Sequence, residues 1–200
     1  MLTDLPNVLT LLRIAAIPVL VALLALHSAL GNVAACVVYT AACITDYLDG
    51  ALARRWQMLS ELGRMMDPIA DKLLVGALLL ALAGLTVLPV FSLYAAIIIM
   101  LREILVSGLR EYRASQRETL PSTRLAKWKT GIQMVAIGFL IGGDKAAAAL
   151  HLSFLPATLI GGILLWISVI PTVLSGWGYL TVGLSRMMAS DPRKSSKIVS

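Results

Sequence analysis

Charged residues are scarce in this 200-residue chain: Asp, Glu, Lys and Arg make up 14% of it, whereas 58% is apolar. A soluble core of this size does not require so much apolar surface, so the composition argues against a soluble globular protein. Four long runs contain no charged residue, namely 14–45, 73–101, 131–143 and 146–185. Because a membrane-spanning helix needs about 20 apolar residues, we expect an all-α polytopic membrane protein with a single domain over residues 1–200.

Cysteine and histidine are also rare, with two of each in the chain. Cys36 and Cys43 lie seven residues apart in one apolar run, on the same helix face but too far apart for a disulfide bond between them. We interpret both as small packing residues. Neither residue type occurs among the acidic residues described below, which argues against a zinc site.

The apolar runs, divided at their turn residues, predict six transmembrane helices. The approximate ranges are Val8–Ser28, Val33–Arg54, Met66–Gly84, a fourth helix that follows Pro89 and ends near Ala114, Leu125–Ile141 and Pro156–Met188. The predicted connections are a turn at 30–32, a linker at 55–65, a turn at 142–145, and residues 146–155, which suit either a short re-entrant piece or a loop. Glycines at 138, 142, 161 and 162 are expected to permit close helix contacts.

Basic residues gather on one predicted side of the membrane. If the six helices alternate in direction, 16 of the 17 Lys and Arg residues fall on one face and only Lys145 on the other. The positive-inside rule therefore predicts that both termini and the polar chemistry lie at the cytoplasmic face of the inner membrane. It also explains the net charge of +6 without nucleic-acid binding.

Some charged residues lie too close to the apolar runs to sit outside the membrane. Only 29 uncharged residues separate Lys72 from Arg102, which is barely enough for two spans and a turn. The residues that must then lie on the helices themselves are Asp67, Asp71, Lys72 and Arg102. We expect them to line a polar, cytoplasm-facing cavity among the helices.

Four aspartates fall at helical spacing on two neighbouring helices. Asp46 and Asp49 are three residues apart, and Asp67 and Asp71 are four apart, so each pair shares one helix face. Cations must neutralise four carboxylates gathered in a membrane, and oxygen ligands favour hard ions such as Mg²⁺ or Mn²⁺. The alternative is a set of solvated helix caps, in which Asp67 caps a helix that begins at Pro68.

Small residues and an arginine follow the first aspartate pair in the stretch DYLDGALARR, residues 46–55. Gly50 and Ala53 leave room for a bulky ligand beside the carboxylates, and Arg54 offers a planar fork suited to phosphate. Together with carboxylates for a metal pair, this pattern predicts a nucleotide diphosphate site. Taken alone, Gly50 and Ala53 would equally allow close helix packing.

The whole pattern resembles the complete signature of the CDP-alcohol phosphatidyltransferase family: Asp46-x2-Asp49-Gly50-x2-Ala53-Arg54-x8-Gly63-x3-Asp67-x3-Asp71. The resemblance implies that Asp46, Asp49 and Asp67 hold two divalent ions and the diphosphate of a CDP-lipid. It implies that Asp71 is the general base and a further metal contact. The implied CDP-binding residues also include Gly50, Ala53, Arg54 and Gly63, and the implied assembly is a homodimer.

Further cations predict a second anion site beside the metals. They are Arg102 and Arg110 on the fourth helix, Lys127 and Lys129 on the fifth, and Arg13 on the first, one turn from Thr10. Such a clamp suits a phosphorylated alcohol rather than a neutral one. The alternative account is positive-inside charge together with snorkelling to lipid headgroups.

Three stretches resemble in particular the family members that make phosphatidylglycerophosphate: PNVLTLLR (6–13), REILVSGLRE (102–111) and KWKT (127–130). This resemblance implies CDP-diacylglycerol as donor and sn-glycerol 3-phosphate as acceptor. The implied acceptor-phosphate clamp is Thr10, Arg13, Arg102, Arg110, Lys127 and Lys129. Other acceptors stay open, namely phosphatidylglycerol as in a cardiolipin synthase, inositol phosphate or serine. A divalent-cation transporter would carry polar positions through the full membrane depth, which this sequence lacks, and a non-catalytic membrane scaffold is the remaining alternative.

Overall fold

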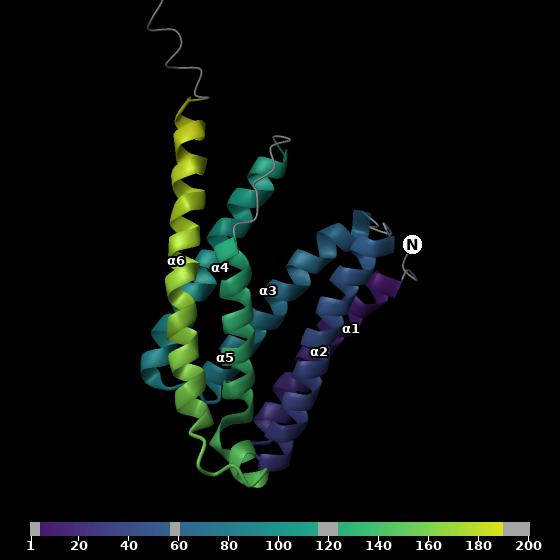
Figure 1. Ribbon diagram of the computed structural model, residues 1–200, viewed down its shortest axis with the longest axis vertical. Helices are drawn as coiled ribbons and strands as arrows, with labels where there is room; N and C mark the ends of the chain where they lie inside the picture. Colours follow the sequence, from purple (N-terminus) through teal and green to yellow (C-terminus); the bar gives the residue numbers. More distant parts are fainter. Residues whose placement is uncertain (1–4, 57–60, 116–123, 190–200) are drawn as a thin grey trace, which may run out of the picture.

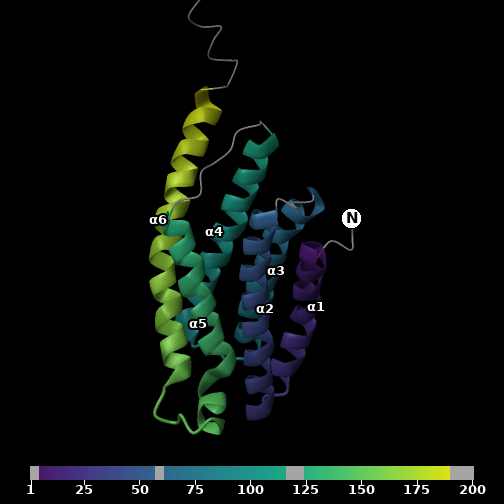
Figure 2. The ribbon, with the colours of Figure 1, turned by 45° about the vertical axis from the view of Figure 1, so that its right-hand side comes forward.

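The computed structural model describes the backbone of residues 5–56, 61–115 and 124–189, and the side chains of residues 8–46, 66–111 and 128–177. Within these ranges the chain forms six helices and no strands, as predicted. They are α1 (Leu5–Ala25), α2 (Ala29–Trp56), α3 (Glu61–Gly84), α4 (Val90–Ser115), α5 (Arg124–Ala149) and α6 (Ala157–Ala189). The helices alternate in direction, so the start of α1 and the end of α6 lie at the same end of the bundle (Figures 1 and 2).

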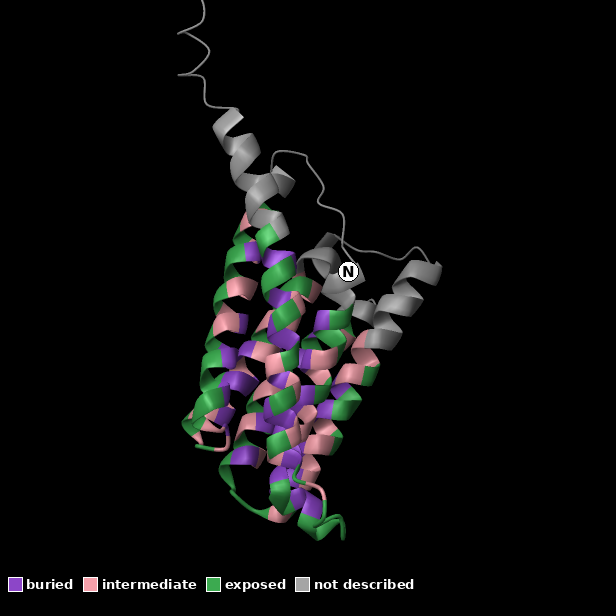
Figure 3. Cartoon of the chain, turned by 60° about the vertical axis from the view of Figure 1, so that its left-hand side comes forward, coloured by how far each residue is buried: buried purple, intermediate pink, exposed green. Residues whose placement is uncertain are grey.

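Five of the helices in the described ranges, all except α3, are long and apolar enough to cross a membrane. Many of their large apolar side chains are exposed, for example Leu30 at 81% and Leu101 at 64%. Exposed residues lie along the outer faces of the helices (Figure 3). On a soluble protein such continuous apolar surface would drive association, whereas against lipid it carries no such penalty. The distribution fits a bundle whose outer faces contact lipid.

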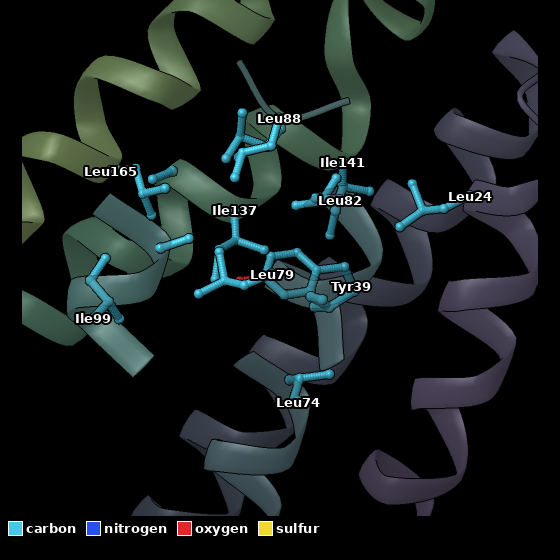
Figure 4. Packing of buried hydrophobic residues seen from close by; sticks show 14 of the residues in the cluster. Leu24, Tyr39, Leu74, Leu79, Leu82, Leu88, Ile99, Ile137, Ile141 and Leu165 are labelled. Carbon is cyan, nitrogen blue, oxygen red and sulfur yellow. The ribbon is translucent and has the colours of Figure 1, made fainter. Parts of the chain in front are cut away.

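A buried apolar cluster joins all six helices (Figure 4). Its members include Leu20, Leu24, Tyr39, Leu78, Leu82, Ile99, Ile137 and Leu165. The one polar group that Tyr39 brings into the cluster is paired, because its hydroxyl donates to the carbonyl of Met134 at 3.0 Å. The cluster fixes how the helices cross and so where their charged ends meet.

Glycine allows α5 and α6 to pack closely, as the sequence predicted. A Cβ atom at Gly161 would lie 2.8 Å from Cγ of Leu140 and 3.0 Å from the backbone nitrogen of the same residue. A Cβ at Gly142 would lie 3.1 Å from Sγ of Cys36, which brings α5 equally close to α2. Both cysteines are free, as expected.

The turn between the first two helices was predicted at residues 30–32, and this is wrong. The turn lies at 26–28, with His27 in the left-handed region at φ 49°, and α2 begins at Ala29. Ser28 caps the new helix, since its hydroxyl accepts a hydrogen bond from the N–H of Gly31 at 3.0 Å. Gly31 serves close packing rather than the turn, because a Cβ there would lie 2.7 Å from the carbonyl oxygen of Leu23.

The third helix begins earlier than the sequence suggested. It starts at Glu61 rather than near Met66, so Gly63 belongs to the helix and not to a linker. Pro68 lies inside α3, which rules out the alternative that Asp67 caps a helix beginning there. Asp67 is therefore a side chain within the helix.

The fifth helix was predicted to end at Ile141, but it continues to Ala149. The expected break is nevertheless present, because Gly143 has φ 59° and ψ −175°, a conformation that residues with a side chain rarely adopt. Helix resumes after it, and only residues 150–156 form the connection to α6. The segment 146–155 is thus partly helical and partly a loop.

Candidate active site

Helix α1 carries two polar side chains, one turn apart, that contact the aspartates of α2 and α3. The hydroxyl of Thr10 donates to Oδ1 of Asp67 at 2.6 Å. Arg13 donates through Nη1 to Oδ1 of Asp71 at 3.1 Å and pairs through Nη2 with Oδ1 of Asp46 at 2.6 Å. Because Asp46 and Asp71 bind the same guanidinium group, their carboxylates converge.

Burial determines what these contacts are worth. Arg13 is 3% exposed, and a guanidinium so far from water is stable only when carboxylates pair with it. The side chains of Asp46 and Asp71 remain 29% and 47% exposed. The cation is thus enclosed, while the two carboxylates keep a side accessible to a ligand.

The aspartates of α2 and α3 fit a hard divalent ion in their chemistry, since such ions prefer carboxylate oxygens as ligands. Among residues with described side chains, however, no three acidic, cysteine or histidine groups lie close enough to hold one ion together. Instead, Arg13 lies between Asp46 and Asp71 and neutralises part of their charge. Asp49, the fourth predicted carboxylate, falls within α2, but its side chain lies outside the described residues.

A cavity of about 230 Å³ lies between α3, α4 and α5. Six charged side chains line it: Asp71, Lys72, Arg102, Glu103, Arg110 and Lys129. Four of the six are cations and two are carboxylates, so the described lining carries a net positive charge suited to an anion. Asp71 takes part in both sites, since it contacts Arg13 and also lines this cavity.

Internal pairing already organises the cavity. Glu103 accepts hydrogen bonds from Lys129 and from Nη1 of Arg102, the latter at 3.2 Å. Lys72 donates to the hydroxyl of Ser107 on α4. Three of the four cavity cations, Lys72, Arg102 and Lys129, are therefore held at defined positions before any ligand binds.

The residues of the predicted acceptor clamp do not all lie in this cavity. Arg102, Arg110 and Lys129 line the cavity, whereas Thr10 and Arg13 contact the aspartates instead of lining it. The remaining predicted site residues have side chains outside the described ones: Asp49, Gly50, Ala53, Arg54, Gly63 and Lys127.

Sequence reasoning assigned no role to several polar residues that the site contains. Lys72 was predicted to line the polar cavity and does so, whereas Glu103, which also lines it, was given no role. From α6, Ser175 and the carbonyl of Thr172 contact Arg102. The available signal was the spacing of Ser168, Thr172 and Ser175 at i, i+4 and i+7, which places three hydroxyls on one face of an otherwise apolar run.

Comparison with known proteins identifies relatives of this chain. Residues 3–174 match the profile of the CDP-alcohol phosphatidyltransferase family. A Rickettsia bellii protein named CDP-diacylglycerol–glycerol-3-phosphate 3-phosphatidyltransferase is 39% identical over 176 residues, which cover 88% of this chain and 93% of that protein. A protein of the same name from Cereibacter sphaeroides is 34% identical, with 90% and 96% covered. A protein of Oryza sativa subsp. japonica named cardiolipin synthase (CMP-forming) is 38% identical, with 74% and 49% covered. The chain therefore belongs to the CDP-alcohol phosphatidyltransferase family.

Proposed function

We propose that the chain transfers the phosphatidyl group of CDP-diacylglycerol to sn-glycerol 3-phosphate, giving phosphatidylglycerophosphate and CMP. One observation carries this choice of acceptor: Asp71 lines the same cavity as Lys72, Arg102, Arg110 and Lys129. A carboxylate that can take a proton thus adjoins cations that can bind a phosphate. A neutral alcohol carries no phosphate for those cations to bind. The names of the Rickettsia bellii and Cereibacter sphaeroides relatives agree with this acceptor.

The residues that would hold two divalent ions, Mg²⁺ or Mn²⁺, are Asp46, Asp49, Asp67 and Asp71. Bound there, such ions supply Lewis-acid stabilisation of negative charge on the oxygens of the donor diphosphate. Gly50, Ala53, Arg54 and Gly63 would line the cytidine and phosphate pocket of the same donor.

The reaction is a displacement at the phosphorus that carries the lipid. The acceptor hydroxyl oxygen forms a bond to this phosphorus, the bond from the phosphorus to the bridging oxygen breaks, and CMP leaves with that oxygen. Asp71 takes the proton of the hydroxyl. Arg13 orients Asp71 through the hydrogen bond to Oδ1, and the cavity cations hold the acceptor phosphate so that its hydroxyl lies near the carboxylate.

We also propose that α3 is a sixth span and that the site opens to the cytoplasm, with both termini on that side. The one-sided distribution of Lys and Arg supports this orientation, as does the common end of the bundle shared by the start of α1 and the end of α6 (Figure 1). In a Cys36→Ser, Cys43→Ser background, Lys145→Cys should react with a membrane-impermeant maleimide added outside intact cells. Labelling only after the cells are opened would contradict the proposed orientation and place residue 145 on the cytoplasmic side.

A homodimer is part of the proposal, and the exposed apolar faces of the helices offer surface for it. Mass measurement of the protein in detergent by light scattering, with the detergent contribution subtracted, tests it. A mass equal to one chain of 21.4 kDa at all concentrations would contradict a dimer.

The decisive experiment measures CMP release from CDP-diacylglycerol by purified protein with each candidate acceptor in turn. We expect turnover with glycerol 3-phosphate, and its loss when EDTA removes divalent ions. Turnover with phosphatidylglycerol alone would support the second candidate, a cardiolipin synthase, which the name of the Oryza sativa relative favours. Turnover with inositol phosphate or serine but not glycerol 3-phosphate would equally refute our choice.

A further inference from the structure

We propose that Ser175 of α6 is a positioning residue that fixes the guanidinium group of Arg102 for the phosphate of the acceptor. This inference rests on the proposed function, because it assumes that the cavity beside Asp71 binds a phosphorylated alcohol. Helix α6 supplies none of the residues that the sequence predicted for the site. Its role is to hold a residue of α4.

Arg102 is held by contacts to each of its three nitrogen atoms. Nε donates to the carbonyl oxygen of Thr172 at 3.0 Å, and Nη2 donates to the hydroxyl of Ser175 at 2.7 Å. Nη1 donates to Glu103, which lines the cavity. A guanidinium group is planar, so two contacts along its Nε–Nη2 edge fix the orientation of the whole group. That edge is bound by α6.

The hydroxyl of Ser175 is itself oriented. It donates to the carbonyl of Pro171 at 2.6 Å and lies 3.2 Å from that of Thr172. Because its proton points to its own helix, its lone pairs face Arg102 and accept from Nη2. Alanine would remove this acceptor, whereas threonine would retain the hydroxyl.

Gly176 supports the same contact through its lack of a side chain. A Cβ atom there would lie 3.0 Å from Cγ and 3.3 Å from Nε of Arg102. The aliphatic part of Arg102 therefore packs directly against the backbone of α6. A methyl group at this position would displace the guanidinium without altering any polar group.

The same face of α6 provides a matched control. Ser168 lies two turns before Ser175 and is buried as well, and its hydroxyl donates to the carbonyl of Leu165 in its own helix. It does not line the cavity. Ser168→Ala therefore removes a buried hydroxyl without touching Arg102.

The test is steady-state kinetics of the full-length protein in lipid nanodiscs, with glycerol 3-phosphate and CDP-diacylglycerol varied separately. We expect Ser175→Ala to raise the KM for glycerol 3-phosphate about tenfold, the effect of losing one hydrogen bond to a charged group, and to change the KM for CDP-diacylglycerol less than about twofold. Ser175→Thr should recover most of the acceptor affinity. Ser168→Ala should leave both constants unchanged.

Gly176→Ala tests the same contact from the backbone side and keeps the inference falsifiable if Ser175→Ala fails to fold. It should also raise the KM for glycerol 3-phosphate selectively. If neither variant changes that constant, if both constants rise together, or if Ser168→Ala has the same effect, the inference is refuted. A wild-type protein without turnover on glycerol 3-phosphate would refute the proposed function and this inference with it, so the two failures are distinguishable.

Discussion

Replacing Arg13 by methionine should make the stability of the protein depend on divalent ions. Arg13 is enclosed at 3% exposure and bound to two carboxylates, at 2.6 Å to Asp46 and 3.1 Å to Asp71. Methionine keeps a long apolar side chain but removes the positive charge between these groups. Without a bound ion, the two carboxylates then repel each other.

The magnitude follows from the burial of the partners. Breaking a buried ion pair by removing one member costs about 3–5 kcal/mol, whereas an exposed pair contributes below about 1 kcal/mol. Asp46 and Asp71 are 29% and 47% exposed, so water relieves part of their charge. We expect a loss of about 2–3 kcal/mol in the presence of chelator, which for a chain of this length lowers Tm by about 4–12 °C.

Divalent ions should reverse this loss. An ion at 100 times its Kd stabilises the folded state by about 2.7 kcal/mol, and in the variant it no longer competes with a guanidinium group. The assay is thermal unfolding, followed by tryptophan fluorescence, in EDTA and in saturating Mg²⁺ or Mn²⁺. The gain on adding the ion should be larger for Arg13→Met than for the wild type.

Arg110→Met is the control, because Arg110 is an exposed cation on α4. Its unfolding should respond to ions as the wild type does. An Arg13→Met protein that loses the same stability with and without ions would refute a counter-ion role. A normal ion response combined with a raised KM for glycerol 3-phosphate would instead indicate that Arg13 binds the acceptor phosphate, as the sequence predicted.

Three further predictions concern packing and chemistry. Gly161→Ala should destabilise the protein by about 1–3 kcal/mol, because a methyl group there overlaps Leu140, while Gly131→Ala, with open space at its Cα, should be neutral or stabilising; thermal unfolding measures both. Asp71→Asn should still bind CDP-diacylglycerol in a filter or fluorescence assay but lose turnover at least a hundredfold, and full turnover would remove it as the base. Removing divalent ions with EDTA should abolish CMP release, and Mg²⁺ or Mn²⁺ should restore it; activity that persists after exhaustive chelation would contradict a metal-assisted reaction.

The helices could be predicted from the sequence because the thickness of the membrane sets their minimum length. A span needs a long apolar run, and five of the helices contain one that few charges interrupt. Their ends were harder to predict where polar and small residues suit both a helix and a turn. Gly31 looked like a turn residue, yet it lies within α2, where it lets the backbone of α1 approach.

The predicted start of α3 was wrong for a related reason. The segment from Glu61 to Asp71 is polar, and polarity beside an apolar run suggests a linker outside the membrane. In the structure it is helical, and Thr10 and Arg13 of α1 form hydrogen bonds with Asp67 and Asp71. Hydropathy alone does not detect such contacts between distant parts of the chain.

The sequence could not show that Arg13 contacts the aspartates while other predicted clamp residues line the cavity, and the reason is geometric. Helical spacing correctly put Thr10 and Arg13 on one face of α1, but their partners Asp67 and Asp71 lie 57 and 58 residues further along the chain. Which helix that face meets depends on how α1 crosses α3. The crossing is set by the apolar cluster, in which Leu20 and Leu24 of α1 pack among residues of the other helices.

Asp71 lies between Arg13 and the cavity, and this position constrains the mechanism. Its carboxylate is bound to Arg13 on the α1 side and lines the cavity that contains Arg102 and Lys129. The hydrogen bond from Arg13 fixes the orientation of this carboxylate relative to the cavity. Glu103 pairs with both Arg102 and Lys129 and offsets one of their two positive charges. The described cavity lining keeps a net positive charge that an arriving phosphate can offset, and the positions of Arg102 and Asp71 relative to each other determine whether the acceptor hydroxyl reaches its base.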